Sequence, residues 1–266
     1  MIRFIDTHSH LYDSAFSQDA DSVIERAVQA GVEQMILPDI DSSVREAMIA
    51  LARRHPEHCH FCIGLHPTEI NAENFDKEMQ AVLSASLLHK DEMVAIGEIG
   101  LDYYWSKEFV ELQQKAFKEQ ILLADSLDKP ILIHCREAIG DCLNILQKYK
   151  GKNTRGVFHA YSGSLETYHE IKKLGNFLLG IGGVVSFKNS GLAKIIENVD
   201  LEDIILETDA PYLTPVPYRG KRNESAYIPL IAKKIAEIKG VSVEEVAQHT
   251  SSNASKMFFG RDFLVK

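Results

Sequence analysis

Eight short β-rich runs alternate with helical segments along almost the whole chain, and this alternation is the strongest constraint on its fold. The runs are Ile2–His8, Gln34–Ile40, Cys59–His66, Met93–Gly100, Pro130–Cys135, Gly156–Ala160, Phe177–Val185 and Asp203–Thr208. Several are nearly all apolar, as expected of strands that are covered on both faces. Amphipathic segments lie between them, at Ala20–Ala30, Val44–Arg54 and Glu108–Ser126. This pattern predicts a parallel sheet with helices outside it.

The length of the chain favours a closed sheet. A barrel of eight parallel strands with surrounding helices needs about 250 residues, and the chain has 266. We therefore predict an α/β protein with a single domain, residues 1–266, folded as a (β/α)₈ TIM-type barrel. A doubly wound open sheet is the alternative, but it usually has fewer strands. Its nucleotide-binding versions also carry a Gly-x-Gly-x-x-Gly after the first strand, which is missing here.

Composition narrows the function classes. No apolar stretch reaches the length of a membrane span, and the N-terminus lacks the apolar run of a signal peptide. We therefore expect a cytoplasmic protein without a membrane partner, with its four cysteines as reduced thiols. The formal net charge of −9 argues against a protein that coats nucleic acid non-specifically, because phosphate binding draws on clustered Lys and Arg. It does not exclude a nucleic-acid enzyme with one local basic patch.

One short segment resembles a zinc knuckle: Cys59 and Cys62, preceded by His55 and His58. It has no second cysteine pair at a suitable spacing. We interpret Cys59–Ile63 as the third strand instead. Near the C-terminus, Ser242 and Glu245 form a capping-box pattern that opens a helix.

Side chains that can bind metals stand at or just after the ends of the apolar runs. They are His8 and His10, His66, Glu98 and Asp102, His134, His159, and Glu207 and Asp209. Barrels of this type place their active sites at the C-terminal ends of the strands. Because side chains alternate across a strand, His8 and His10 project to the same side and form a chelating pair.

These residues predict a centre for two divalent metal ions. Asp209 could both bind an ion and accept a proton from its water, and Glu98 could bridge two ions. His134 and His159 would complete the second site. Mixed imidazole and carboxylate ligands suit Zn, Mn or Mg, and the sequence does not choose among them. His66, Asp102 and Glu207 are candidates for supporting or substrate-binding roles. Each residue alone is more often a rim or capping residue, so the prediction rests on their joint occurrence.

At these positions the chain resembles the TatD-type metal-dependent deoxyribonucleases, a branch of the amidohydrolase superfamily. The resemblance covers nearly the whole chain and is carried by Asp6–Leu11, Gly64–Pro67, Ala95–Tyr104, Pro130–His134, Glu207–Leu213 and Pro217–Glu224. It implies a (β/α)₈-type fold and assigns one metal ion to His8, His10 and Asp209 and the other to His134 and His159, with Glu98 bridging. Ser9 stands where many relatives carry Cys, and Ser225 where Pro is usual; neither departure removes a candidate ligand.

The resemblance implies phosphodiester hydrolysis. We expect a deoxyribonuclease that acts on DNA, at single strands or ends, as an exonuclease using a two-metal-activated water. Asp209 and Glu98 are the expected catalytic groups, and the chain is treated as a monomer. Small-molecule amidohydrolase or esterase activity and deacylation of aminoacyl-tRNA are alternatives on the same centre. A non-enzymatic interaction protein would be expected to lack one or more of the six ligands.

A basic segment after the eighth run supports an anionic substrate. Arg219 and Arg222 could hold a phosphate bidentately, Asn223 could add a hydrogen bond, and Arg136 could join them. A solvated basic loop is the alternative interpretation. Several aromatic residues also follow strand ends and could stack on bases, although most such residues are core or rim: Tyr103, Tyr104, Trp105, Tyr161 and Phe187.

Overall fold

The computed structural model describes residues 2–150 and 153–261. Within these ranges, eight strands form one sheet in which every neighbouring pair is parallel and the spatial order follows the chain. The strands are β1 (Phe4–Asp6), β2 (Val32–Leu37), β3 (Cys59–Ile63), β4 (Ala95–Asp102), β5 (Ile131–Arg136), β6 (Gly156–Phe158), β7 (Phe177–Ile181) and β8 (Ile204–Leu206).

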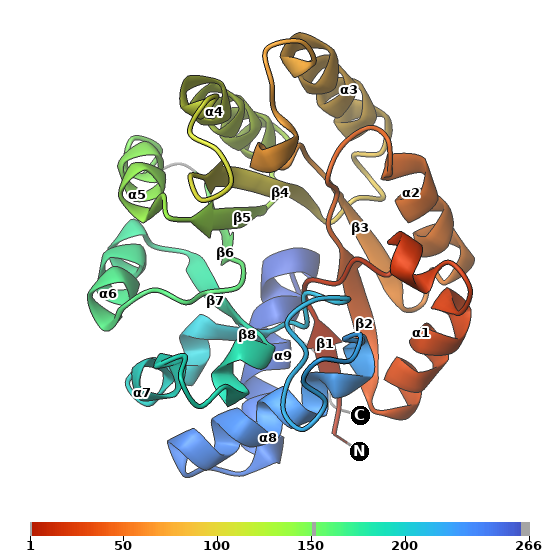
Figure 1. The fold of residues 1–266 in the computed structure, drawn as a ribbon, viewed down its shortest axis with the longest axis vertical. Coiled ribbons are helices and arrows are strands. Elements are labelled where there is room, and N and C mark those ends of the chain that lie inside the picture. Colours follow the sequence, from red (N-terminus) through yellow and green to blue (C-terminus); the bar gives the residue numbers. More distant parts are fainter. Residues whose placement is uncertain (1, 151–152, 262–266) are drawn as a thin grey trace.

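Helices surround this sheet on its outside (Figure 1). They are α1 (Ala20–Gln29), α2 (Arg45–Arg54), α3 (Phe75–Leu88), α4 (Val110–Ser126), α5 (Ile139–Gln147), α6 (Leu165–Leu174), α7 (Leu192–Ile196), α8 (Ile228–Lys239) and α9 (Val243–Phe259). Short 3-10 helices lie in the connections, at η1 (Ser14–Phe16), η2 (Pro67–Glu69), η3 (Gly183–Ser186), η4 (Leu201–Asp203) and η5 (Ser225–Tyr227). The predicted TIM-type barrel is confirmed.

The barrel is closed where its first and last strands meet. The Thr7 amide donates to the Leu206 carbonyl at 3.0 Å, and the Asp209 amide donates to the His8 carbonyl at 2.9 Å. These bonds join β1 and β8 and their continuations at the C-terminal end of the sheet. Closure therefore brings His8 and Asp209 side by side although they are far apart in the sequence.

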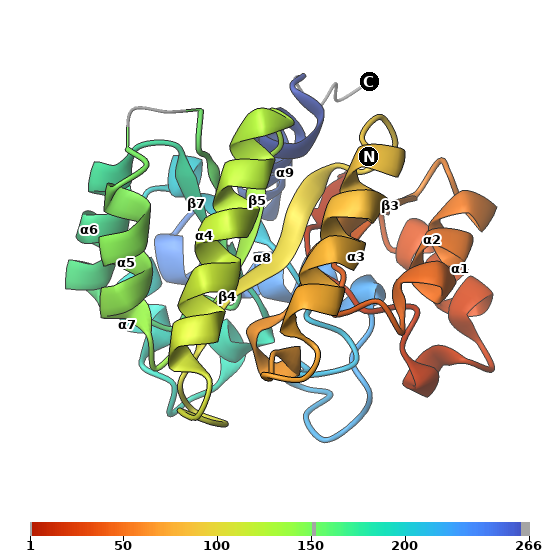
Figure 2. The same cartoon turned by 90° about the horizontal axis from the view of Figure 1, so that it is seen from above.

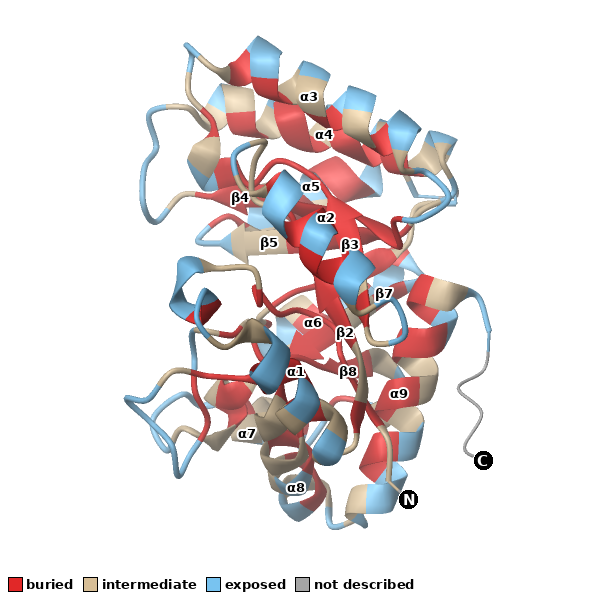
Figure 3. Cartoon of the chain, turned by 90° about the vertical axis from the view of Figure 1, so that its right-hand side faces the viewer, coloured by how far each residue is buried: buried red, intermediate tan, exposed pale blue. Residues whose placement is uncertain are grey.

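Two apolar layers stabilise the fold. One lies between the strands and the outer helices, so that each helix buries the face it turns to the sheet (Figure 3). The other fills the inside of the barrel and includes Ile5, Leu132 and Ile205 together with Met257 and Phe258 of α9. This second layer closes the N-terminal end of the barrel and leaves the C-terminal end for polar side chains. No helix among the described residues is long and apolar enough to cross a membrane.

The predicted elements agree with the structure except at some ends. The three predicted helices are α1, α2 and α4, and the Ser242 hydroxyl accepts the Glu245 amide at the start of α9, as the capping pattern predicted. The seventh run, predicted to extend to Val185, ends at Ile181, because η3 begins at Gly183. The Leu213 carbonyl packs so closely there that a Cβ at Gly183 would lie 2.1 Å from its oxygen.

Candidate metal centre

The connections that follow the strands gather at one end of the barrel, opposite the end where both termini lie (Figure 2). All six predicted metal ligands lie there, and they come from five different strands. His8 and His10 follow β1, Glu98 lies in β4, His134 in β5, and His159 and Asp209 follow β6 and β8. The parallel topology thus converts scattered sequence positions into one polar cluster.

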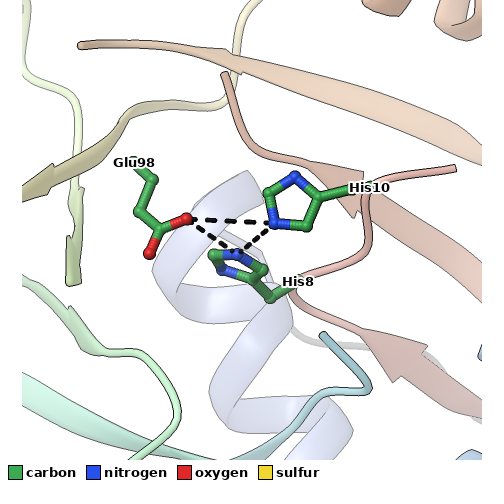
Figure 4. A group of neighbouring side chains, drawn as sticks. All are labelled: His8, His10 and Glu98. Atoms are coloured by element: carbon green, nitrogen blue, oxygen red, sulfur yellow. Dashed lines mark hydrogen bonds and ion pairs between the residues drawn. The ribbon is translucent and has the colours of Figure 1, made fainter. Parts of the chain in front are cut away.

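The first group of donors consists of His8, His10, Glu98 and Asp209. The two Nε2 atoms of His8 and His10 lie 3.2 Å apart, and Glu98 Oε2 lies 3.1 Å from His8 Nε2 (Figure 4). Asp209 Oδ1 lies 3.5 Å from His10 Nε2 and 3.9 Å from His8 Nε2. Donors bound to one ion at about 2.1 Å are separated from one another by roughly 3–4 Å. The spacing of these four side chains fits a single divalent cation.

The second group forms around the other oxygen of Glu98. Its Oε1 lies 3.0 Å from His134 Nδ1, 3.6 Å from His66 Nε2 and 3.8 Å from His159 Nε2. The atoms of His66, Glu98 and His134 are close enough together to hold an ion. His66 was predicted only as a supporting or substrate-binding residue, and its Gly-Leu-His-Pro context at the end of β3 was the available signal for a ligand.

Two further carboxylates orient the histidines of this cluster. Asp102 Oδ2 lies 2.8 Å from His134 Nε2, and Glu207 Oε1 lies 3.1 Å from His159 Nδ1. Carboxylates behind ligating histidines fix the ring orientation and raise the basicity of the nitrogen that faces the ion. Asp102 and Glu207 therefore lie behind these two histidines, and a supporting role, one of those predicted for them, stays a prediction.

Charge keeps the carboxylates of the cluster ionised. Burial alone would raise the pKa of Glu98, but His8, His159 and His66 hold the pKa of that carboxyl well below its usual range. The pKa of Asp209 is lowered in the same way, against burial, by His159 and His10.

The histidines respond in opposite directions. Burial lowers the pKa of His8. Burial would also lower the pKa of His159, but Glu207, Glu98 and Asp209 raise it to about 10. A cation bound among these side chains would take the place of the imidazole protons, so we expect metal binding to release protons.

Asp39, which follows β2, is hydrogen-bonded to β4 at Glu98 and to the residue after β3. Its carbonyl accepts the Glu98 amide at 3.0 Å, and its Oδ2 accepts from Arg45 Nε at 2.6 Å and from the Gly64 amide at 3.2 Å. Burial raises the pKa of Asp39 to about 7 despite Arg45. The sequence pattern did not point to Asp39 and Arg45. Asp39 follows a strand and Arg45 begins a helix, and neither has a metal-binding residue beside it in the sequence.

A buried carboxylate also holds Asp209. Asp6 Oδ1 accepts the Thr208 amide at 2.9 Å, and its Oδ2 accepts the Thr208 hydroxyl at 2.6 Å. The next residue, Asp209, has a φ of 56°, which is unusual for a residue other than glycine. The bond from the Thr208 amide to Asp6 and the bond from the Asp209 amide to the His8 carbonyl stabilise this backbone conformation.

The structure divides the four predicted phosphate-binding residues into two pairs. Arg222 pairs with Asp19 at 2.7 and 2.9 Å, and its guanidinium lies over the Phe16 ring. The side-chain Nδ2 of Asn223, a buried residue, donates to the Thr208 carbonyl just before the loop and to the Tyr212 carbonyl within it. Arg222 and Asn223 therefore hold the 209–224 loop in place.

Arg219 and Arg136 are placed differently. Both are exposed, and each guanidinium lies over an aromatic ring, Arg219 over Phe187 at 3.6 Å and Arg136 over Tyr104 at 3.7 Å. Neither has a carboxylate partner within residues 2–150 and 153–261. Their N–H groups remain available to an anion.

The cysteines agree with the sequence interpretation. Cys59 and Cys62 lie in β3, as predicted, and no described cysteine forms a disulfide. The three groups of side chains that could hold a metal ion in the described part of the chain contain no cysteine.

Comparison with known proteins is consistent with this geometry. The family model "TatD related DNase" matches residues 5–259. The "Uncharacterized metal-dependent hydrolase YabD" of Bacillus subtilis is 36% identical, covering 95% of this chain and 98% of that protein. The "3'-5' ssDNA/RNA exonuclease TatD" of Erwinia tasmaniensis is 33% identical, covering 94% and 97%. The crystal structure of YJJV, a TatD homologue from Escherichia coli K12, superposes with a TM-score of 0.89 at 30% identity, covering 97% of this chain and 98% of that one.

Proposed function

Because this chain belongs to the family of TatD related DNases, we propose that it is a metal-dependent hydrolase that cleaves phosphodiester bonds of single-stranded DNA from an end. The observation that carries the proposal is the position of Glu98, which presents one carboxylate oxygen to each of two groups of imidazoles. A bridging carboxylate between two such groups is suited to a pair of divalent ions. The relative named as a 3'-5' exonuclease supports the choice of substrate.

The family resemblance assigns His8, His10 and Asp209 to one ion and His134 and His159 to the other. Glu98 turns one oxygen to each group, and His66 lies close enough to Glu98 and His134 to be a further donor. Bound there, divalent ions supply charge that lowers the pKa of water and stabilises the phosphate oxygens. Their donors are imidazole nitrogens and carboxylate oxygens, which Zn and Mn accept.

Asp209 is the proposed general base. Its side chain is 16% exposed, the most open of the four side chains in the first donor group, so water and substrate can reach it. Its lowered pKa keeps the carboxylate ionised at neutral pH. In the proposed reaction Asp209 takes the proton of the attacking water as the new P–O bond forms. The bond to the sugar oxygen breaks, and that oxygen takes up a proton from solvent to leave as a hydroxyl group.

In this proposal the exposed arginines bind the phosphate groups of the substrate. Arg219 and Arg136 have free N–H groups beside the cluster and can donate to phosphate oxygens. Arg222 and Asn223 would act indirectly, because they hold in place the loop that carries Arg219.

The test is digestion of a single-stranded oligonucleotide, labelled in turn at its 5′ and 3′ ends, with Mg²⁺ or Mn²⁺ and with EDTA as a control. We expect shortening that requires metal, and a loss of about 10²–10⁴ in rate for Asp209→Asn. Asp128→Asn makes the same chemical change at a side chain that is 76% exposed in the α4–β5 connection, and should leave the rate unchanged. An oligonucleotide that survives every metal tried would refute the nuclease proposal and direct attention to small amides, esters and aminoacyl-tRNA.

A further inference from the structure

Two aromatic rings stand exposed next to the metal centre. Tyr104 and Trp105, in the connection between β4 and α4, are 50% and 69% exposed and meet edge to face at 5.1 Å. Their neighbour Tyr103 is fixed instead, because its hydroxyl donates to Asp141 at 2.9 Å and accepts from Gln114 at 3.0 Å. Of the other aromatic residues predicted to follow strand ends, Tyr161 is buried and the Phe187 ring is covered by Arg219. Of these predicted rings, Tyr104 and Trp105 are therefore the exposed ones. Trp105 is the more exposed, and it is the ring available to a partner because Arg136 lies over the Tyr104 ring.

One carboxylate connects these rings to a candidate metal ligand. Asp102 Oδ1 accepts the amides of Tyr104 and Trp105 at 2.9 and 3.0 Å, while its other oxygen lies 2.8 Å from His134 Nε2. The backbone of the aromatic pair is thus held by the same group that orients the imidazole. A molecule that rests on the rings lies within reach of the cluster that would cleave it.

A positive charge completes the arrangement. Arg136 follows His134 by two residues on β5, and its guanidinium lies 3.7 Å from the centre of the Tyr104 ring and 5.4 Å from that of Trp105. It has no carboxylate partner among the described residues. A guanidinium that rests on an aromatic face keeps its N–H groups free for phosphate oxygens.

We propose that Tyr104, Trp105 and Arg136 form a subsite for one unpaired nucleotide of the substrate. The base stacks on the exposed indole of Trp105, and Arg136 binds the adjoining phosphate. Aromatic stacking tolerates every base, because each has a π-face. A base inside a duplex already has both faces covered by its neighbours, so this subsite selects single strands and frayed ends. The inference rests on the proposed function for its substrate class.

Trp105 makes the subsite directly observable, since it is the only tryptophan in the chain. The experiment titrates the full-length Asp209→Asn protein with Mg²⁺ and a ten-residue single strand of thymidylate, and follows the intrinsic tryptophan emission. Two further probes are an abasic sugar–phosphate strand of equal length and a blunt, G·C-rich duplex of two strands without a loop. We expect saturable quenching with the thymidylate strand and little with the other two.

Variants separate stacking from general binding. Affinity is measured by the anisotropy of a labelled strand, so that Trp105 itself can be replaced. Trp105→Ala should weaken binding roughly 5- to 150-fold, and Trp105→Phe, which keeps a flat ring, should restore most of it. Leu88→Ala is the matched control: it truncates a side chain that is 76% exposed at the C-terminal end of α3, which leads into the start of β4 and so lies at the opposite end of the barrel, and it should bind as tightly as the parent.

The outcomes keep the two proposals apart. If the thymidylate strand leaves the emission unchanged while the wild-type protein still degrades it, the subsite is wrong and the nuclease proposal stands. If the abasic strand quenches equally, contact is through phosphate and stacking is refuted. If quenching and the Trp105→Ala loss appear but no metal supports cleavage, the subsite stands as a nucleic-acid binding site and the proposed hydrolysis fails.

Discussion

At the scale of single residues, Glu207 owes its place to the absence of a side chain at Gly180. A Cβ at Gly180 would lie 2.1 Å from Glu207 Oε2, and the other oxygen of that carboxylate lies 3.1 Å from His159 Nδ1. Gly180 of β7 therefore makes room for the group that orients a candidate ligand. Glycines at positions 180, 182 and 183 allow close approach to the backbone, but only the structure identifies what approaches.

Gly180→Ala should disturb the metal centre without touching a ligand. The new methyl group would push the Glu207 carboxylate aside and release the ring of His159, and loss of such orienting groups typically lowers metal affinity about 10–100-fold. Titration of Mn²⁺ followed by calorimetry measures the effect. Gly140→Ala is the control, because nothing lies within 4 Å of its added Cβ. Equal affinity in both variants would show that Glu207 has no such role.

Residue types were easier to predict than residue partners. The candidate ligands could be chosen because each stands at the end of its own strand, and the topology alone brings those ends together. Arg222 and Asn223 also stand near the site in sequence, but their partners, Asp19 and the Thr208 carbonyl, are set by how the 209–224 loop folds back. No local pattern encodes such distant partners, and so the sequence could not separate a loop-holding arginine from a substrate-binding one.

At the scale of elements, the apolar runs located the strands but not all their ends. A strand ends where another segment takes its place, as the Leu213 carbonyl does at Gly183, and this is a tertiary effect. The contact between His60 of β3 and Phe259 of α9 is a second tertiary effect that the apolar runs do not show. His60 Nε2 of β3 donates to the side-chain oxygen of Gln34, and the ring meets the Phe259 ring edge-on, with centroids 4.7 Å apart.

The packing of His60 predicts a dependence of stability on pH. Burial, with Arg261 and His58 nearby, lowers the pKa of His60 from 6.5 to about 4. Between these values the unfolded chain binds a proton that the folded protein does not, so this contribution is full above pH 6.5 and is lost as the pH falls toward 4. At pH 5 the loss is about 1–2 kcal/mol, allowing for partial exposure.

Urea unfolding at pH 7 and pH 5 measures this effect. His60→Gln keeps an amide that can bond to Gln34 and removes the titration, so its free energy of unfolding should fall less between the two pH values than that of the parent. Other histidines titrate in both proteins and cancel in the comparison. An identical fall in parent and variant would show that His60 titrates normally in the folded state.

At the scale of the whole molecule, the cluster depends on closure of the barrel. The six predicted ligands come from five strands and lie on both sides of the β1–β8 seam, where the Asp209 amide bonds to the His8 carbonyl. The unfolded chain cannot hold these groups together. A divalent ion bound to them would therefore bind the folded protein alone, and its binding free energy would add to the stability of the entire barrel.

Thermal unfolding should accordingly depend on metal. At a free ion concentration 100 times the dissociation constant, the stabilisation is about 2.7 kcal/mol, which corresponds to a rise in Tm of roughly 5–10 °C for a chain of this size. EDTA should reverse the rise. His10→Gln should remove most of it, whereas substitution of His249, a half-buried histidine of α9 paired with Glu202 (His249→Gln), should retain it. A rise that survives in His10→Gln would place the ion elsewhere, since His10 Nε2 lies within 4.0 Å of both carboxylates proposed to bind it.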